Sequence, residues 1–182
     1  MDNFGHAPGQ CWFDALFVGW QMSEKLATRL ARLRAELAKQ QLDGLIIGRE
    51  DMFQGEEVPP GDERLAYITG FTGSAGFALI TAHAAAVFSD GRYSLQMVSQ
   101  TDPANWQCHT LLQYSLDDYL DQHPLDGLTV GIDPKLVTMA GYERYADSIS
   151  KAGGQLIALD ANPVDAIWCD QPAISASSAW RM

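Results

Sequence analysis

Short, continuous apolar runs alternate along this chain with stretches whose apolar residues recur every three or four positions. The clearest run is formed by Leu45, Ile46 and Ile47, with no polar residue between them. Such a run is typical of a strand buried on both faces of a sheet, whereas the longer period is typical of an amphipathic helix. Alternation of the two predicts an α/β fold, in which helices cover a central sheet.

The first helix is predicted from Ser23 to Gln41. Serine is a favoured N-cap residue, and four leucines follow at helical spacing, namely Leu26, Leu30, Leu33 and Leu37. They give one apolar stripe on an exposed helix. Residues 1–22 are expected to be a leader, either flexible or docked, because termini are loose unless tied down. The domain is expected to span 23–170, and 171–182 reads as a linker to a following domain.

Further strands are predicted at 65–69, 77–81, 84–88, 106–112, 128–132 and 155–159, and further helices at 94–101, 115–122, 138–152 and 163–168. The strands 77–81 and 84–88 are joined at Ala82 and His83, which indicates a hairpin. A hairpin contains an antiparallel pair. The predicted fold is therefore α/β with a mixed β-sheet and helices on both faces.

The charge balance limits the partners. The chain carries 12 Lys and Arg against 23 Asp and Glu, a formal net charge of −11. An acidic surface repels phosphate groups, which argues against general nucleic-acid binding and against a polybasic membrane patch. No apolar run approaches the roughly 18 residues of a membrane-spanning helix. We expect neither a nucleic acid nor a membrane as partner.

The cysteines and histidines provide no recognisable metal or nucleophile motif. Cys11, Cys108 and Cys169 are odd in number and widely spaced, which argues against a disulfide framework or zinc knuckle and favours a reducing cytoplasm. Cys108 and His109 are adjacent, and adjacent side chains of a strand point to opposite faces. We therefore expect a buried thiol beside an edge histidine, with no catalytic residue and no metal ligand.

Two other groups have ordinary structural explanations. Gly70, Gly73 and Gly76 form a GxxGxxG pattern, which is neither the dinucleotide fingerprint nor a P-loop. Either a tight bend against the sheet or ligand contact through free N–H groups would explain it. An acidic cluster near the start of a predicted helix indicates a solvated face; it consists of Asp117, Asp118 and Asp121.

Arg92 is the candidate binding residue. It lies in a turn after a hydrophobic strand, between Gly91 and Tyr93, in an acidic chain. A guanidinium there can pair with a carboxylate or bind a substrate carbonyl. The alternative is a structural pair with Asp90 or another nearby acid.

A similar polar set flanks the loop from Gly48 to Arg64, whose length of about 17 residues is typical of functional or disordered loops. The set consists of Arg49, Glu50, Asp51 and Arg64. Attachment of the loop to the sheet is an alternative role for it.

Six ordered motifs resemble the N-terminal domain of Xaa-Pro aminopeptidases (aminopeptidase P). They are Arg49-Glu50-Asp51 with Gln54-Gly55-Glu56 and Val58-Pro59-Pro60, then Asp62-Glu63-Arg64-Leu65-Ala66-Tyr67, Thr69-Gly70-Phe71-Thr72-Gly73-Ser74-Ala75-Gly76, Asp90-Gly91-Arg92-Tyr93, Gly131-Ile132-Asp133-Pro134, and Asn162-Pro163-Val164-Asp165-Ala166-Ile167-Trp168. The resemblance extends from Leu26 to Pro172. Six motifs in the same order are far more specific than any single glycine pattern.

The resemblance implies a creatinase-type domain, non-catalytic on its own. In the larger members a second similar domain follows, then a catalytic domain with two divalent metal ions, usually manganese. That domain releases the N-terminal residue preceding proline. The family's metal ligands have no counterparts in this sequence. The resemblance implies that the arginine of the family's DGRY motif contacts the bound peptide, and the matching residue here is Arg92. Such domains also support dimerisation and restrict access to the cleft.

Three hypotheses follow. The first is the N-terminal domain of a cytoplasmic Xaa-Pro aminopeptidase, whose partners would be a peptide with proline second, its own C-terminal catalytic domain and a second copy. The second is a stand-alone peptide-binding module without peptidase activity. The third is a nucleotide-binding sheet domain that uses residues 70–76.

Overall fold

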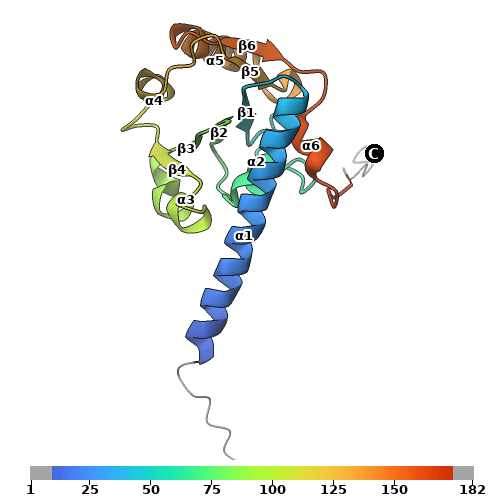
Figure 1. Cartoon of the computed structure of the whole chain (residues 1–182), viewed down its shortest axis with the longest axis vertical. Helices are drawn as coiled ribbons and strands as arrows, with labels where there is room; N and C mark the ends of the chain where they lie inside the picture. The colour runs from blue at the N-terminus through green and yellow to red at the C-terminus, as the bar shows by residue number, and fades with distance from the viewer. Residues whose placement is uncertain (1–9, 174–182) are drawn as a thin grey trace, which may run out of the picture.

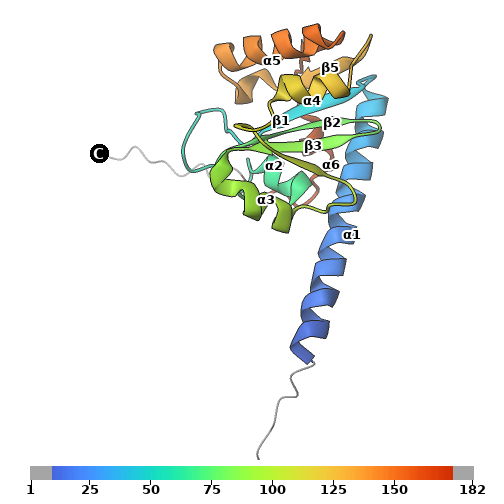
Figure 2. The ribbon, with the colours of Figure 1, turned by 90° about the vertical axis from the view of Figure 1, so that its left-hand side faces the viewer.

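The computed structural model describes the backbone of residues 10–173 and the side chains of residues 25–173. Within these residues, six strands form one mixed sheet, and helices cover both of its faces (Figures 1 and 2). The predicted fold class, α/β with a mixed sheet, is therefore confirmed.

Most strands of the sheet point the same way. The strands are β1 (Gly44–Gly48), β2 (Phe77–Thr81), β3 (Ala85–Ser89), β4 (Gln107–Thr110), β5 (Thr129–Ile132) and β6 (Gln155–Ala158). Their order is β4-β3-β2-β1-β5-β6. Because β2 is antiparallel to both neighbours and all other pairs are parallel, the segments that leave the other five strands meet at one edge. We call it the carboxyl edge.

The helices are divided between the two faces. α1 (Gln10–Lys39), α2 (Arg64–Thr69), α3 (Ser94–Gln100) and α6 (Pro163–Ile167) pack on one face, and α4 (Leu116–Gln122) and α5 (Met139–Lys151) on the other (Figure 2). Two short 3-10 helices, η1 (Gly91–Tyr93) and η2 (Pro134–Leu136), follow β3 and β5. None of the helices in residues 10–173 has the length and apolar composition needed to cross a membrane.

Alternating strand residues supply the two cores. In β1, Leu45 and Ile47 belong to the core under α1, while Ile46 belongs to the core under α4 and α5; this is the two-residue period of a strand. Phe77 and Phe88 face each other across β2 and β3, and their rings stack with centroids 4.8 Å apart. The apolar stripe of α1 is fully buried, as predicted, and each leucine contributes about 1.5–3 kcal/mol.

The start of α1 differs from the prediction. The helix begins at Gln10, so Ser23 is an interior residue rather than an N-cap. Residues 10–22 of the predicted leader are helical, and α1 extends beyond the sheet (Figure 1). No proline interrupts 10–39, and Gly19 opposes the helix by only about 1 kcal/mol. The rest of the leader, residues 1–9, and most of the predicted linker, residues 174–182, lie outside the described residues.

The strand predicted from Leu65 to Thr69 is wrong, because this segment is the helix α2. A short apolar run alone does not distinguish a strand from a buried helix. Leu65 and Ile68, three positions apart, are both buried, as one helical face requires. Gly70 ends the helix in the left-handed conformation with φ of 82°, which glycine adopts without strain.

The predicted hairpin and helix starts are largely confirmed. Residues 77–81 and 85–89 pair as antiparallel β2 and β3. Ser115 and Asp118 form a reciprocal capping box at α4, and the other acidic residues of this helix are exposed, as predicted. Asn162 caps α6, with Pro163 at its first position. Strand β4 is shorter than predicted, since it ends at Thr110.

Candidate functional site

The turn after β3 places Arg92 at the carboxyl edge. Asp90 is the N-cap of η1, and its carboxylate accepts the backbone N–H of Arg92 at 2.9 Å. Aspartate suits this position because it satisfies an N–H group that the helix start leaves unpaired. The Arg92 side chain is 72% exposed, so its guanidinium is accessible from the solvent.

Asp90 also binds the Arg92 guanidinium. Nε lies 3.1 and 3.2 Å from the two carboxylate oxygens, and Nη2 lies 2.7 Å from Oδ2. Hydrogen bonding from Arg92 lowers the pKa of Asp90, and the same contact raises the pKa of Arg92. The structural pair considered from the sequence is therefore present. A role of Arg92 in binding substrate stays a prediction.

Tyr93 connects this turn to the glycine-rich segment 70–76. Its hydroxyl lies 2.5 Å from that of Ser74, and its ring packs edge-on against Phe71 with centroids 6.0 Å apart. The hydrogen bond with Ser74 lowers the pKa of Tyr93. The Arg92 guanidinium lies 5.3 Å from the Tyr93 ring centre, within cation–π range. The turn and the segment are thus one connected part of the carboxyl edge.

Backbone conformation and close packing account for the three glycines. Gly70 and Gly76 have φ values of 82° and 147°, which residues with a side chain rarely adopt. A Cβ atom at Gly73 would overlap the ring of Phe71, and one at Gly76 would lie 2.6 Å from the carbonyl oxygen of Phe88. Of the two interpretations of the GxxGxxG pattern, the tight bend explains every glycine without a ligand.

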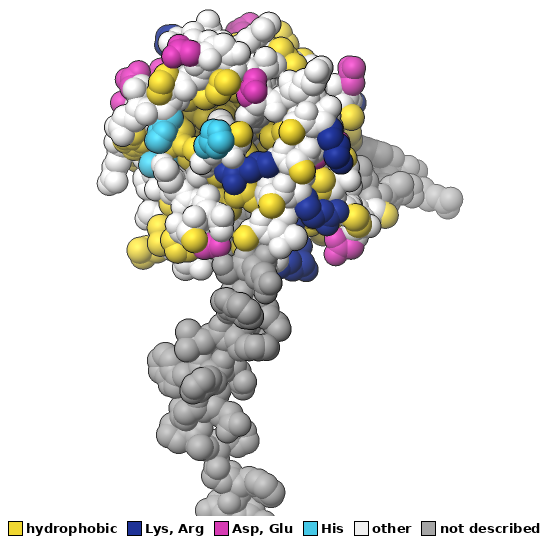
Figure 3. All heavy atoms as spheres, viewed as in Figure 1, with side chains coloured by type: hydrophobic (Ala, Val, Ile, Leu, Met, Phe, Trp, Pro, Cys, Tyr) yellow, Lys and Arg dark blue, Asp and Glu magenta, His cyan; other side chains and the backbone are white. Residues whose placement is uncertain are grey.

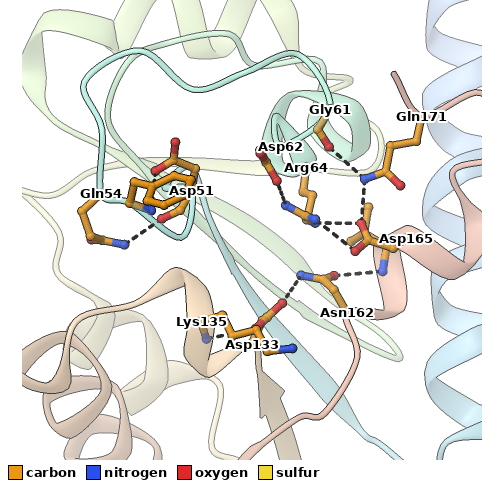
Figure 4. A network of polar contacts seen from close by, with 12 residues as sticks. Asp51, Gln54, Gly61, Asp62, Arg64, Asp133, Lys135, Asn162, Asp165 and Gln171 are labelled. Carbon is orange, nitrogen blue, oxygen red and sulfur yellow. Dashed lines mark hydrogen bonds and ion pairs between the residues drawn. The ribbon is translucent and has the colours of Figure 1, made fainter. Parts of the chain in front are cut away.

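A buried arginine attaches the long loop after β1 to α6. Arg64 is 6% exposed. It donates Nη1 to Asp62 at 2.8 Å, and Nε and Nη2 to Asp165 at 2.7 and 3.0 Å (Figure 4). Gln171 donates to the carbonyl of Gly61 at 2.8 Å and to Asp165 at 3.0 Å. The donors of Arg64 are therefore engaged in holding the loop.

The first residues of the same loop have structural partners as well. Asp51 is 3% exposed, and its Oδ1 accepts the backbone N–H groups of Phe53 and Gly55 at 2.9 and 3.0 Å. Arg49 donates to the carbonyl of Glu56 at 2.7 Å. Arg49, Asp51 and Arg64 thus support the loop, which is the structural alternative considered for this set.

Glu50, the fourth member of the set, is exposed and lines a small cavity outside the carboxyl ends of β1 and β5. The cavity has a volume of about 30 Å³, enough for roughly one or two water molecules. Burial, with a contribution from Glu50, raises the pKa of Tyr145 in its wall to about 12. The cavity is too small for a peptide or a nucleotide.

Cys108 and His109 point to opposite faces of β4, as predicted. Cys108 packs on the α1 side, and burial raises the pKa of its thiol. His109 stacks on Phe88 and Tyr114 with ring centroids 5.3 and 4.7 Å away. Burial and then neighbouring His123 lower the pKa of His109. In the view of Figure 3, histidine side chains gather beside hydrophobic surface. The arrangement is not a nucleophile–base pair.

The described side chains do not fit a site for two metal ions of the kind that the sequence resemblance implies for the family's catalytic domain. Among residues 25–173, no group of three His, Cys, Asp or Glu is arranged to hold a metal ion. The acidic residues near Arg64 bind Arg64 itself or cap backbone N–H groups.

A set of exposed apolar side chains at the carboxyl edge was not predicted from the sequence. Among the described residues, the large hydrophobic side chains that are exposed all lie on segments following β1, β3, β4 or β5: Met52, Phe53, Leu95, Val98, Leu111, Leu112 and Met139. The backbone N–H of Leu111 binds the carbonyl of Ser89 at 2.9 Å, beside the Arg92 turn.

The sequence of this chain matches a known domain family and several proteins of that family. The sequence pattern described as Creatinase/Prolidase N-terminal domain matches residues 29–167. The "Probable Xaa-Pro aminopeptidase P" of Pyrenophora teres f. teres is 41% identical over 152 residues, and that of Coccidioides posadasii is 36% identical over 165 residues. They cover 80% and 87% of this chain, which corresponds to 23% and 25% of those proteins. The chain thus spans about a quarter of their length.

Solved structures show the same relationship. The X-prolyl aminopeptidase of Caenorhabditis elegans, described as a cytosolic enzyme with a di-nuclear active site, has a TM-score of 0.73 at 26% identity, covering 81% of this chain and 26% of that chain. An aminopeptidase of Streptococcus pyogenes has a TM-score of 0.59 at 21% identity, covering 80% of this chain and 98% of that chain, and supports the fold alone. The chain therefore belongs to the creatinase/prolidase N-terminal domain family.

Proposed function

We propose that this chain is the non-catalytic N-terminal domain of a metal-dependent Xaa-Pro aminopeptidase, an enzyme that releases the N-terminal residue preceding proline. One observation carries the proposal: the 41% identity to an Xaa-Pro aminopeptidase P covers 80% of this chain but only 23% of that protein. The domain shapes the substrate cleft, and the part of the enzyme that follows it performs the hydrolysis.

The metal ions are assigned to that following part. Two divalent ions, which we propose to be manganese, lie outside this domain, since residues 25–173 offer no suitable group of donors. A metal-bound water of lowered pKa is the usual nucleophile of such hydrolases. The residues of this chain serve binding and positioning rather than bond cleavage.

Arg92 is the proposed contact with the peptide substrate. Ligands of open α/β sheets bind outside the carboxyl ends of the strands, and Arg92 lies there with its side chain 72% exposed. Its guanidinium offers N–H donors to the oxygens of a peptide, while its backbone is fixed by Asp90. Arg92→Ala in the longer enzyme is expected to raise KM roughly tenfold, the effect of losing one charge-assisted hydrogen bond.

The exposed apolar residues support contacts with another domain and a second subunit. Side chains such as Leu95 and Leu112, 86% and 89% exposed, favour burial against a partner surface. The proposed partners are the C-terminal catalytic domain and a second copy of the chain. A cytoplasmic location is supported by the widely spaced cysteines and by the Caenorhabditis elegans relative, which is described as cytosolic.

An activity assay on the purified 182-residue chain tests the proposal. With manganese and an Xaa-Pro peptide we expect no release of the first residue, whereas the product of the longer reading frame releases it. Cleavage by the chain alone would overturn the assignment. A stop codon directly after Met182 would instead favour a stand-alone peptide-binding module, for which the apolar carboxyl edge is the supporting observation.

A further inference from the structure

The contact between Asp90 and Arg92 leaves part of the guanidinium unused. Asp90 accepts hydrogen bonds from Nε and Nη2 at 2.7–3.2 Å. Among the described residues, Nη1 has no hydrogen-bond partner, and the side chain is 72% exposed. A ligand that approaches from the solvent can therefore reach Nη1, while the Asp90 carboxylate stays bound to Nε and Nη2 of the same guanidinium.

This arrangement distinguishes neutral acceptors from charged ones. A peptide carbonyl accepts a hydrogen bond from Nη1 without bringing a charge. A carboxylate would approach a guanidinium whose charge Asp90 already compensates, and would be repelled by Asp90 at close range. The pair therefore weakens the preference for carboxylates that a free arginine has.

Asp90 cannot easily leave the guanidinium. Its Oδ1 also accepts the backbone N–H of Arg92 at 2.9 Å, so a rotation that frees the guanidinium breaks the cap of η1. Tyr93, hydrogen-bonded to Ser74, fixes the other side of the turn. The exposed side chains of Leu95 and Leu111 add apolar surface beside it.

We propose that Asp90 is a specificity-determining residue, which makes Arg92 a receptor for a neutral main-chain carbonyl of the peptide and disfavours a free C-terminal carboxylate. The inference rests on the proposed function, in which Arg92 contacts the substrate. The ligand class is thus a peptide that continues beyond the group bound by Arg92, or one whose terminus is blocked.

The test compares the tripeptide Ala-Pro-Leu with its C-terminal amide by NMR titration of the ¹⁵N-labelled chain. The Arg92 Nε–H signal, identified from its loss in Arg92→Lys, reports binding. In the unmodified chain the amide is expected to bind at least as tightly as the free acid. In Asp90→Asn, which keeps an N-cap acceptor, the free acid is expected to gain roughly fivefold over the amide, the range of a partly screened ion pair.

Asp121→Asn is the matched control, since it removes one exposed negative charge from α4, an element other than the Arg92 turn. Its ratio of affinities should equal that of the unmodified chain. An unmodified chain that prefers the free acid, or an Asp90→Asn variant with an unchanged ratio, would overturn the inference. If the amide leaves the Arg92 signal unmoved while Asp90→Asn still captures the free acid, the proposed peptide contact and the binding of a neutral carbonyl by Arg92 both fail, and only the discrimination of Asp90 against carboxylates stands.

Discussion

Arg64 donates Nε and Nη2 to the two carboxylate oxygens of Asp165, which lies 101 residues later in the chain. The same guanidinium binds Asp62 through Nη1 at 2.8 Å. This fork joins the start of α2 to α6, and Gln171 extends it to the carbonyl of Gly61. The long loop after β1 is thereby attached to α6 and to Gln171.

Arg64→Met should destabilise the chain. The variant keeps an apolar stem but leaves two carboxylates without their cation. Removing one partner of a buried ion pair lowers the free energy of unfolding by about 3–5 kcal/mol. Because the Asp165 side chain is 37% exposed, solvent reduces this effect, and we expect about 2 kcal/mol. Urea unfolding measures it.

The control is Lys39→Met, at a side chain 73% exposed in its pair with Glu36. It should change stability by less than about 0.5 kcal/mol. An equal loss of unfolding free energy in Arg64→Met and Lys39→Met would show that the buried ion pairs of Arg64 stabilise the chain no more than an exposed pair does.

Local patterns predicted the elements that local physics decides. Hairpin strands, the cap at Ser115 and the apolar stripe of α1 follow from propensity and periodicity within a few residues. The segment from Leu65 failed because its run fits both a strand and a buried helix, and only packing decides. The start of α1 at Gln10 was missed because Ser23 looked like a cap.

The site was less predictable than the fold. The local pair of Arg92 with Asp90 was one of two interpretations that the turn sequence allowed. The partner of Arg64 was not predictable, since no local rule connects residues so distant in sequence. The exposure of Leu112 was also missed, because it depends on where β4 ends.

Gly76→Ala should be more harmful than Gly127→Ala. Both glycines have positive φ, 147° and 72°, but an added Cβ meets the carbonyl oxygen of Phe88 only at Gly76, and nothing lies within 4 Å of it at Gly127. The backbone conformation alone accounts for about 1–2 kcal/mol at Gly127. The close approach should bring the loss at Gly76 to about 3 kcal/mol. Thermal or urea unfolding of both variants gives the comparison, and similar losses would mean that space near Phe88 is not limiting.

The two leucines Leu33 and Leu95 should respond differently to truncation. Leu33 in α1 is 0% exposed, and Leu95 in α3 is 86% exposed. Leu33→Ala should lower the free energy of unfolding by about 3 kcal/mol, the usual effect of a cavity in a core. Leu95→Ala should change it by less than about 0.5 kcal/mol. If Leu95→Ala proves costly, its side chain is covered in solution, and size-exclusion chromatography of the variant would then show a smaller species than the unmodified chain.

The stability of the chain should fall in mild acid because of His109. Its ring lies between Phe88 and Tyr114, near Tyr119 and His123, and its Nε2 atom is buried without a hydrogen-bond partner among the described residues. Burial, with His123, lowers the pKa of His109 below its ordinary value. As pH falls through about 6.5, the unfolded chain therefore binds a proton before the folded chain does. The contribution of His109 to the free energy of unfolding has its full value above that pH and decreases below it, until His109 of the folded chain is protonated too.

His109→Phe separates this effect from the titration of carboxylates, which acts in both proteins. The variant keeps the aromatic stack but has no side chain at this position that can bind a proton. Relative to the variant, the unmodified chain should therefore lose unfolding free energy between pH 8 and pH 5. His83→Gln, at an exposed position between β2 and β3, controls for the loss of an imidazole as such. A difference that stays constant over this range would mean that His109 has the same proton affinity in the folded and unfolded states, and that the aromatic stack does not exclude its charged form.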